Sequence, residues 1–311
     1  RAILLYIEAI EAPRKFMSAA RAAARNKPVL VVKAGRSAQG QQAAASHTGA
    51  LASADIVFDA AIRRAGMLRV DTLQELFVAA EALARHHGSL PADGARLERL
   101  TLLTNGGGAG VMAADAAAAA GLELAPLPPA TRAALDAFLP ANWSHGNPVD
   151  IIGDAPVERY VQTLQALLAE PDTGTLLFMH APTAIVPSAD IARALLPLAS
   201  AEPRRLVSCW LGGPGLAEAR QIFHAAGIPS YDTPEQAVQA CAMLATYRRN
   251  QEQLLQAPSA DTAPVVPDLD RVREIVAAVL TEGREMLTEP EAKALLHAAG
   301  IPVTATEVVG P

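Results

Sequence analysis

Two stretches of this chain repeat one another: AGMLRVDTLQE at residues 65–75 and AGIPSYDTPEQ at residues 226–236. Each begins with Ala-Gly, passes through a short run and reaches Asp-Thr before a segment of helical periodicity. Thr72 and Thr233 can cap the two helices, and an acidic or amide residue three positions later completes a capping box in each. A strand–helix unit that occurs twice indicates two copies of one fold.

Apolar runs alternate with Ala- and Leu-rich helical segments on both sides of these repeats. Continuous apolar strands that alternate with helices are typical of parallel sheets with both faces covered. Each copy ends in the pattern strand, helix, strand, helix, and the first copy lacks its front half. Strands are expected at residues 3–7, 29–32, 67–70, 100–104, 122–124, 175–179 and 206–210, and helices at 54–64, 73–85 and 157–168.

The predicted fold class is α/β, with two doubly wound parallel-sheet domains, the first of them truncated. The first domain covers residues 1–92 and the second residues 96–255. Residues 256–267, rich in Pro, Ala and Ser, form a linker. Residues 268–311 begin a third domain, with helices near 269–280 and 289–298 and a strand after Gly300. Both ends of the chain fall within strand units, so we expect a fragment of a longer protein.

Composition excludes several classes of function. The net charge is −6 with no block of like charges, which argues against nucleic acid as the main partner. No uncharged apolar run reaches the ~18 residues of a membrane span. Cys209 and Cys241 are not in a metal-like spacing and read as reduced core thiols of a cytoplasmic protein. The His, Asp and Glu residues also lack metal-ligand spacing, so no metal site is expected.

The segment AAASHTGALA at residues 43–52 places His47 among small residues, where a ligand can approach the backbone closely. An imidazole there could carry a phosphoryl group on one ring nitrogen, and the other nitrogen would need an acceptor. Glu8, which follows the strand 3–7, is the candidate acceptor. A plain surface histidine and a solvated strand-end glutamate are the alternatives.

A second candidate site begins at Asn105, where Gly106, Gly107 and Gly108 follow a strand and open a helix. Backbone N–H groups and the helix dipole make such a turn an anion site, although a tight packing turn also fits. Asn147 and Asp150 follow in Asn-Pro-Val-Asp (residues 147–150) and could shape the loop around the histidine. Turn formation and helix capping explain these two residues equally well.

Together these motifs resemble the NDP-forming acyl-CoA synthetases, relatives of succinyl-CoA synthetase. Residues 46–52 resemble the family's phosphohistidine loop, and residues 5–10 the strand that carries its supporting glutamate. The other matching segments are residues 33–36 in the intervening turn, 104–108 at a phosphate-binding helix start, 147–150 after it, and 287–302 at the entry to an ATP-grasp domain. The resemblance implies two flavodoxin-like domains, the first truncated, followed by the start of an ATP-grasp domain.

The resemblance implies an acid–thiol ligase that interconverts acyl-CoA, ADP and phosphate with carboxylic acid, CoA and ATP through an acyl phosphate. His47 would carry the phosphoryl group, supported by Glu8, with Thr48 and Gly49 joining residues 105–108 in binding phosphate. CoA, ATP or ADP, and Mg²⁺ would bind mainly outside residues 1–311, so the fragment alone is expected to be inactive. A homo-oligomer or an ATP-grasp subunit or domain is the expected protein partner.

Two other functions remain open from the sequence. The chain could be the acyl-CoA-sensing body of a fused protein lysine acetyltransferase. It could also be a doubly wound domain pair that binds another anion at Gly106–Gly108. The acyl substrate and the choice between ADP and GDP are not set by these residues.

Overall fold

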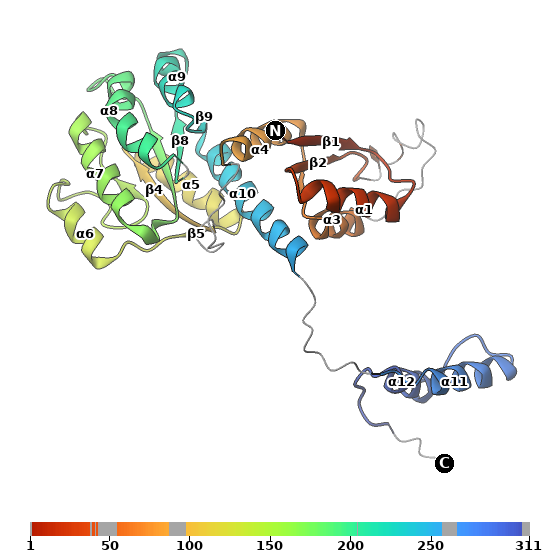
Figure 1. Ribbon diagram of the computed structural model, residues 1–311. Coiled ribbons are helices and arrows are strands. Elements are labelled where there is room, and N and C mark those ends of the chain that lie inside the picture. The colour runs from red at the N-terminus through yellow and green to blue at the C-terminus, as the bar shows by residue number, and fades with distance from the viewer. Residues whose placement is uncertain are drawn as a thin grey trace. The chain divides into compact units, whose positions relative to one another are not determined.

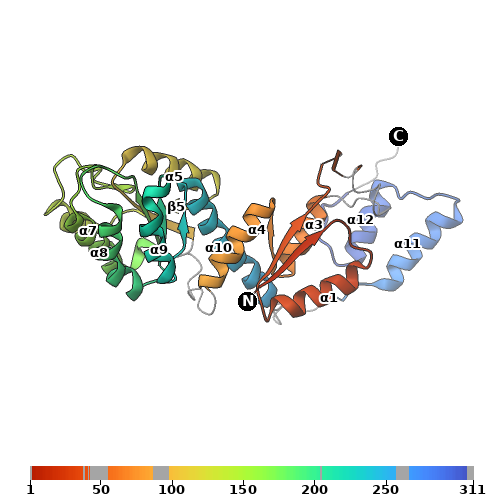
Figure 2. The same cartoon turned by 90° about the horizontal axis from the view of Figure 1, so that it is seen from above.

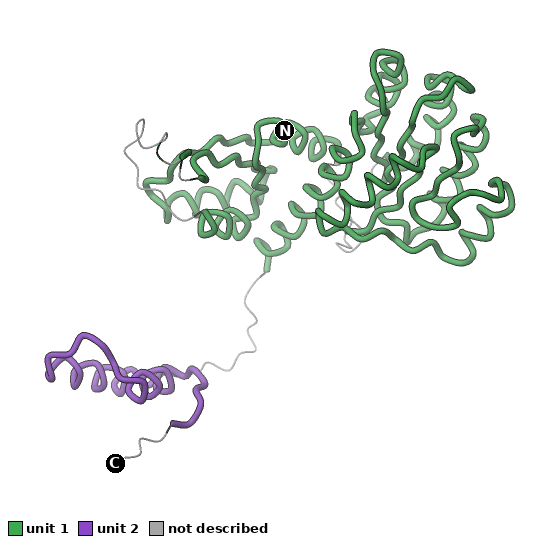
Figure 3. Tube along the Cα trace, turned by 180° about the vertical axis from the view of Figure 1, so that it is seen from behind, with its two compact units in different colours: residues 1–256 green, residues 257–311 purple. Residues whose placement is uncertain are grey.

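The computed structural model describes residues 2–37, 39, 40, 42, 55–86, 98–203, 205–256 and 266–306. The chain divides into two compact units, residues 1–256 and residues 257–311 (Figure 3). Two parallel β-sheets lie in the first unit. The α/β class with two parallel sheets, expected from the alternation of apolar and helical segments, is therefore confirmed.

The first sheet contains the parallel strands β1 (Ile3–Ile7), β2 (Val29–Lys33) and β3 (Leu68–Val70) in that order. Helices α1 (Pro13–Ala24) and α3 (Asp55–Arg64) cover one face of β2, where Val29 and Val31 are buried. Helix α4 (Leu73–His86) covers the other face, over Leu30 and Val32. Because both faces are covered, β2 is apolar at successive positions instead of alternating with polar residues.

The second sheet has the strand order β5-β4-β7-β8-β9, and β6 pairs with the far end of β4. Of the strands in this sheet, β4 comes first in the chain but lies inside the sheet, which is the flavodoxin-like order. All strands are parallel, and the point where the strand order changes its direction of growth lies between β4 and β7. The two-residue strands β6 and β9 are too short to give an apolar run. The strands are β4 (Arg99–Thr104), β5 (Glu123–Leu124), β6 (Val149–Asp150), β7 (Thr175–His180), β8 (Leu206–Trp210) and β9 (Ser230–Tyr231).

Helices cover both faces of this sheet as well. Helices α5 (Gly107–Ala119) and α10 (Pro234–Leu255) pack on one face, where Ala113 and Ala117 are buried against the strands. These two alanines let α5 lie close to the sheet because their side chains are small, whereas Ala118 and Ala119 at the end of the helix are exposed. The opposite face is covered by α6 (Pro129–Asp136), α7 (Val157–Ala169), α8 (Ser188–Ala201) and α9 (Ala217–Ala225).

Helix α10 joins the two sheets. Its first part packs against α5, and its last part extends along α4 and α3 toward the first sheet (Figures 1 and 2). Asn250 donates a buried hydrogen bond of 2.7 Å from Nδ2 to the Met67 carbonyl, and Leu254 belongs to the core of the first sheet. Gly66 has φ +75°, and a Cβ there would lie 2.5 Å from the Leu254 side chain. Glycine is required at this position because the helix passes so close.

The repeat noticed in the sequence forms equivalent structures. Each copy runs from a glycine with positive φ into an edge strand and then into a helix, β3–α4 and β9–α10. The hydroxyls of Thr72 and Thr233 accept hydrogen bonds from the N–H groups three residues later, 3.1 and 3.2 Å away, so both act as helix caps as expected. Glu75 reaches back to the N–H of Asp71 instead of that of the cap residue.

The second unit contains α11 (Leu269–Thr281) and α12 (Glu289–Ala298), close to the expected bounds. Thr288 and Glu291 form the predicted capping box of α12. The strand expected after Gly300 is wrong for residues 301–306, which adopt no regular structure. A strand needs a neighbour for its backbone hydrogen bonds, and the described part of this unit offers two helices. Across all the described residues, no helix combines the length and apolar character that crossing a bilayer requires.

Candidate functional site

Glu8 lies at the carboxyl end of β1, beside Lys33 at the end of β2. The Tyr6 hydroxyl approaches the Glu8 carboxylate at 3.5 Å, the outer limit of a hydrogen bond. Burial lowers the pKa of Lys33, an effect that the carboxylates of Asp55 and Glu8 oppose. The Glu8 side chain is partly exposed. His47, Thr48 and Gly49 lie outside the described residues, so the pairing of Glu8 with His47 stays a prediction.

Two ion pairs hold the residues on either side of the His47 segment. Arg36 pairs with Asp71, and the two side-chain oxygens of Asp55 accept hydrogen bonds of 2.8 and 2.7 Å from Arg69. The Arg69 side chain is only 8% exposed. None of these four residues was expected in the site, although Arg36 ends the turn at residues 33–36. The sequence signal for Asp71 was the Asp-Thr pair that both repeats share. Its counterpart in the second repeat, Asp232, also pairs with an arginine, Arg220, at 2.9 Å.

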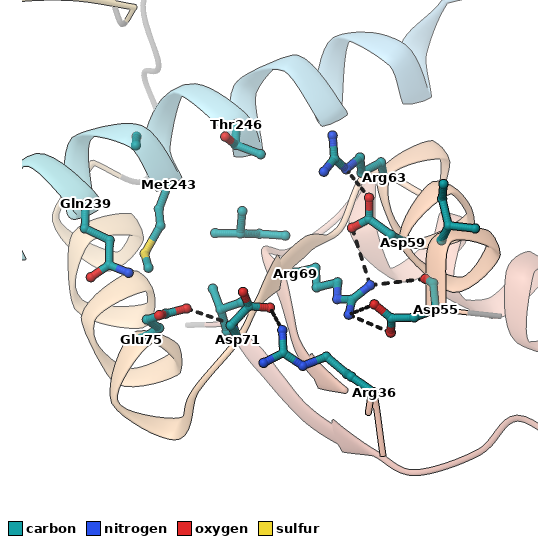
Figure 4. Close-up of a pocket in the computed structure, with 14 residues that line it drawn as sticks. Arg36, Asp55, Asp59, Arg63, Arg69, Asp71, Glu75, Gln239, Met243 and Thr246 are labelled. Atoms are coloured by element: carbon teal, nitrogen blue, oxygen red, sulfur yellow. Dashed lines mark hydrogen bonds and ion pairs between the residues drawn. The ribbon is translucent and has the colours of Figure 1, made fainter. Parts of the chain in front are cut away.

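These ion pairs line a cavity of about 530 Å³ between α3, β3, α4 and α10 (Figure 4). Asp59 extends the network, since it pairs with Arg63 at 2.8 Å and with Arg69 at 3.6 Å. Gln239, Met243 and Thr246 face the cavity from α10. Each of the three arginines in the wall is already paired with a carboxylate, so the cavity offers a ligand little uncompensated charge.

The Asn105–Gly108 turn lies where β4 ends and α5 begins, between β6 and β7. The Thr104 hydroxyl accepts a hydrogen bond of 3.0 Å from the Gly106 N–H and so fixes the start of the turn. Gly106 is the N-cap residue and has no side chain to cap the helix. As at every helix start, the N–H groups of Gly107 and Gly108 lack acceptors inside the helix. The turn therefore has the geometry of an anion site.

The Asn105 side chain has a structural partner. Its Nδ2 donates to the Ala181 carbonyl, its Oδ1 accepts from the Ala181 N–H, and both hydrogen bonds measure 2.8 Å. The amide thus joins the ends of β4 and β7, the point where the sheet order reverses. These two bonds use one of the two Nδ2 hydrogens and one Oδ1 lone pair, so they fix the amide, and contact of Asn105 with phosphate stays a prediction.

Asn147 and Asp150 occupy different places around the same strand end. Asn147 bonds to the Leu102 N–H and to the carbonyls of Leu100 and Ala125, which fills the gap where β5 stops pairing with β4. Asp150 accepts from the Ile152 N–H at 2.9 Å. Its other oxygen would lie 3.0 Å from a Cβ at residue 107, so Asp150 borders the turn directly.

Ile152 adopts φ +69°, a conformation that a β-branched residue rarely takes. Strain of this kind persists only where the surroundings impose it, and it is concentrated at functional sites. The next residue, Gly153, lies close to the backbone of Asn105. A Cβ added to Gly153 would be 3.6 Å from the Asn105 carbonyl oxygen. The loop after β6 therefore lies against the Asn105–Gly108 turn through its own backbone as well as through Asp150.

His180 is buried at the end of β7, between Tyr160 and Ser188. Burial lowers its pKa to about 4, so the ring is neutral near pH 7. It is therefore a core histidine, not a titrating group at the rim of the turn. Within the described residues, no three His, Cys, Asp or Glu side chains come together as a metal site would require.

Comparison with known proteins assigns each of the two sheets to a domain family. Residues 1–83 match the succinyl-CoA ligase like flavodoxin domain, and residues 100–252 match the Ligase-CoA domain. An acetate–CoA ligase (ADP-forming) I from Archaeoglobus fulgidus is 35% identical over 301 residues, covering 97% of this chain and 41% of the relative. The alpha subunit of acetate–CoA ligase (ADP-forming) I from Pyrococcus furiosus is 36% identical over 249 residues, covering 78% of this chain and 52% of the relative.

Among solved structures, the dinucleotide-forming acetyl-coenzyme A synthetase 1 of Ca. Korarchaeum cryptofilum, in complex with phosphate and ADP, matches with a TM-score of 0.74 and 31% identity. The match covers 83% of this chain and 55% of that one. The two parallel sheets thus belong to two domains of CoA ligases, residues 1–83 and residues 100–252. The chain belongs to the NDP-forming acetate–CoA ligase (ADP-forming) family, and it spans about half the length of the relatives it matches.

Proposed function

We propose that residues 1–311 are the central part of an ADP-forming acyl-CoA synthetase. The full protein would interconvert acyl-CoA, ADP and phosphate with carboxylic acid, CoA and ATP. In the direction of ATP formation, phosphate displaces CoA from the acyl group and gives an acyl phosphate. The phosphoryl group then passes to a nitrogen of His47, which releases the carboxylate, and finally to ADP.

The single observation that carries this proposal is the uncapped start of α5 at the reversal point of the second sheet. The N–H groups of Gly107 and Gly108 and the dipole of a helix of 13 residues face the place where phosphate charge would lie. Donors that are already in position stabilise a phosphoryl group without reorganisation when it arrives. Family membership supports His47 as the carrier, with Glu8 as the acceptor that orients its other ring nitrogen.

The remaining parts of the reaction would lie outside this chain. We propose that residues 268–311 are the entry to an ATP-grasp domain, which would bind Mg²⁺ and the nucleotide, and that CoA binds in a further domain. The 311-residue chain alone should then show no ligase activity. ATP consumption that depends on both acid and CoA, measured with these residues alone, would contradict this division.

Phosphoryl transfer to His47 can be tested with the full-length protein, labelled ATP and Mg²⁺. The label should be acid-labile and base-stable, as expected for phosphohistidine, and His47→Ala should abolish it. His224→Ala is the matched control, because His224 is an exposed histidine on α9 and lies outside the proposed site. Unchanged labelling in His47→Ala would remove His47 as the carrier.

A further inference from the structure

Three elements meet at His180, the last residue of β7. Its Nδ1 lies 3.3 Å from the Tyr160 hydroxyl on α7, and its Nε2 lies 3.0 Å from the Ser188 hydroxyl at the start of α8. The ring also packs edge-on against Trp210, with the centroids 5.4 Å apart. His180 is fully buried, so these contacts fix the end of β7.

Ala181 transmits this position to the anion turn. It follows His180 directly, and its N–H and carbonyl form the two 2.8 Å hydrogen bonds with the Asn105 amide. The Ala181 side chain also restricts the space beside Gly106, since a Cβ on Gly106 would lie 3.2 Å from the Ala181 Cβ. A displacement of residue 181 would therefore move both the anchor of the turn and one of its walls.

We propose that His180 is a positioning residue for the Asn105–Gly108 turn. It sets the direction of the first N–H groups of α5 without touching phosphate itself. The inference rests on the proposed function, in which that turn binds the phosphoryl group. Hydrogen bonds to phosphate oxygens weaken steeply when donors move off line, so the placement of the turn controls its affinity.

The neutral state of the ring suits this role. A neutral imidazole has one donor nitrogen and one acceptor nitrogen, so a hydroxyl bonded to each nitrogen fixes both the ring and its neighbours. An imidazolium would carry two donors and would place a buried charge beside Tyr160 and Trp210. The contacts at His180 thus favour a fixed scaffold over proton exchange with the substrate.

The test uses the full-length protein with inorganic phosphate as the probe. The Kd for phosphate is measured by calorimetry, and the KM values for phosphate and acyl-CoA are measured in the ATP-forming reaction. Ser188→Ala and His180→Leu should raise the Kd and KM for phosphate about five-fold or more and leave the KM for acyl-CoA unchanged. His180→Asn keeps a hydrogen-bonding group and should recover part of the loss.

Ser208→Ala and Tyr231→Phe are the matched controls. Ser208 donates a buried hydrogen bond of 2.8 Å to the Pro229 carbonyl, and Tyr231 is a buried tyrosine on β9, so each variant removes a buried hydroxyl away from the turn. Neither control should change the Kd for phosphate. If His180→Leu does not fold, Ser188→Ala and Tyr160→Phe decide the question.

The two ideas fail in different ways. Phosphate affinity that is the same in Ser188→Ala and Ser208→Ala, while wild-type protein is still labelled on His47, overturns the positioning role alone. A change in phosphate Kd without any labelling supports the positioning role and removes His47 as the carrier. Wild-type protein that does not bind phosphate at all overturns both.

Discussion

Asn250 and Met67 are 183 residues apart in the chain, yet the Asn250 side chain donates a buried 2.7 Å hydrogen bond to the Met67 carbonyl. The bond connects the last third of α10 to the strand entry of the first sheet. Gln251, the next residue, bonds to the Gly66 carbonyl in the same way. The two sheets are therefore joined through side chains of one helix that recognise a backbone turn of the other sheet.

We expect Asn250→Ala to lower the free energy of unfolding by about 1–3 kcal/mol, because it leaves the Met67 carbonyl buried without its donor. The urea midpoint of the 311-residue chain measures the effect. Gln253→Ala removes an exposed amide from the same helix and should change the midpoint little. Equal midpoints for the two variants would mean that water replaces the lost bond.

Arg69→Met should destabilise the chain by about 1–2 kcal/mol, because Asp55 and Asp59 lose the guanidinium that neutralises them. The estimate is moderate since the Asp55 side chain is 37% exposed and can be hydrated. Arg193→Met removes a 54% exposed arginine from surface pairs with Asp190 and Glu218 and should cost less than about 1 kcal/mol. Thermal midpoints that fall equally in both variants would argue against a special role for the half-buried pair.

Gly107 and Gly108 should respond differently to alanine. A Cβ at Gly107 would lie 3.0 Å from the Asp150 carboxylate, whereas nothing lies within 4 Å of a Cβ at Gly108. Gly108→Ala should therefore gain up to about 1 kcal/mol from helix propensity, while Gly107→Ala gains less or loses stability. Thermal unfolding of the two variants side by side tests this, and a shift of the same sign and size would contradict it.

His180 should make stability depend on pH between about 4 and 6.5. Burial lowers its pKa in the folded state from 6.5 to about 4, so in this range the unfolded state binds more protons. The contribution of His180 to the free energy of unfolding is fully present above pH 6.5. It decreases as the pH falls toward 4, by about 3 kcal/mol in total. Urea midpoints at several pH values should show the gap between wild type and His180→Gln narrowing toward pH 4. Parallel curves would contradict the buried neutral state.

The sequence predicted the local elements well because their signals are local. Each strand expected from an apolar run is present within two residues of its bounds, and the caps at Thr72, Thr233 and Thr288 formed as their spacing required. The family resemblance, based on short motifs in a fixed order, is confirmed by both domain matches. The prediction of a strand after Gly300 was wrong for residues 301–306. A few apolar residues after a glycine are not enough, because a strand also needs a neighbouring strand to pair with.

The candidate site was predictable only in part. The glycine turn was visible because Gly-rich helix starts have a sequence signature, but the partner of Asn105 was not. Ala181 lies 76 residues away and contributes only its backbone, which leaves no trace in residue type. For the same reason, the sequence could not separate the turn-forming and loop-supporting roles of Asn147, whose three partners are all backbone groups.

By itself, then, the sequence determined the α/β class, the duplicated strand–helix unit, the helix caps and the family. Periodicity, capping and glycine act over a few residues and so are written in neighbouring positions. Only the tertiary structure decided that β4 lies beside β7, that α10 joins the two sheets and that His180 is buried next to the residue that anchors Asn105. Those contacts depend on which apolar surfaces, distant in the sequence, pack together and exclude water. That packing depends on the folded chain as a whole and is not encoded in any short segment.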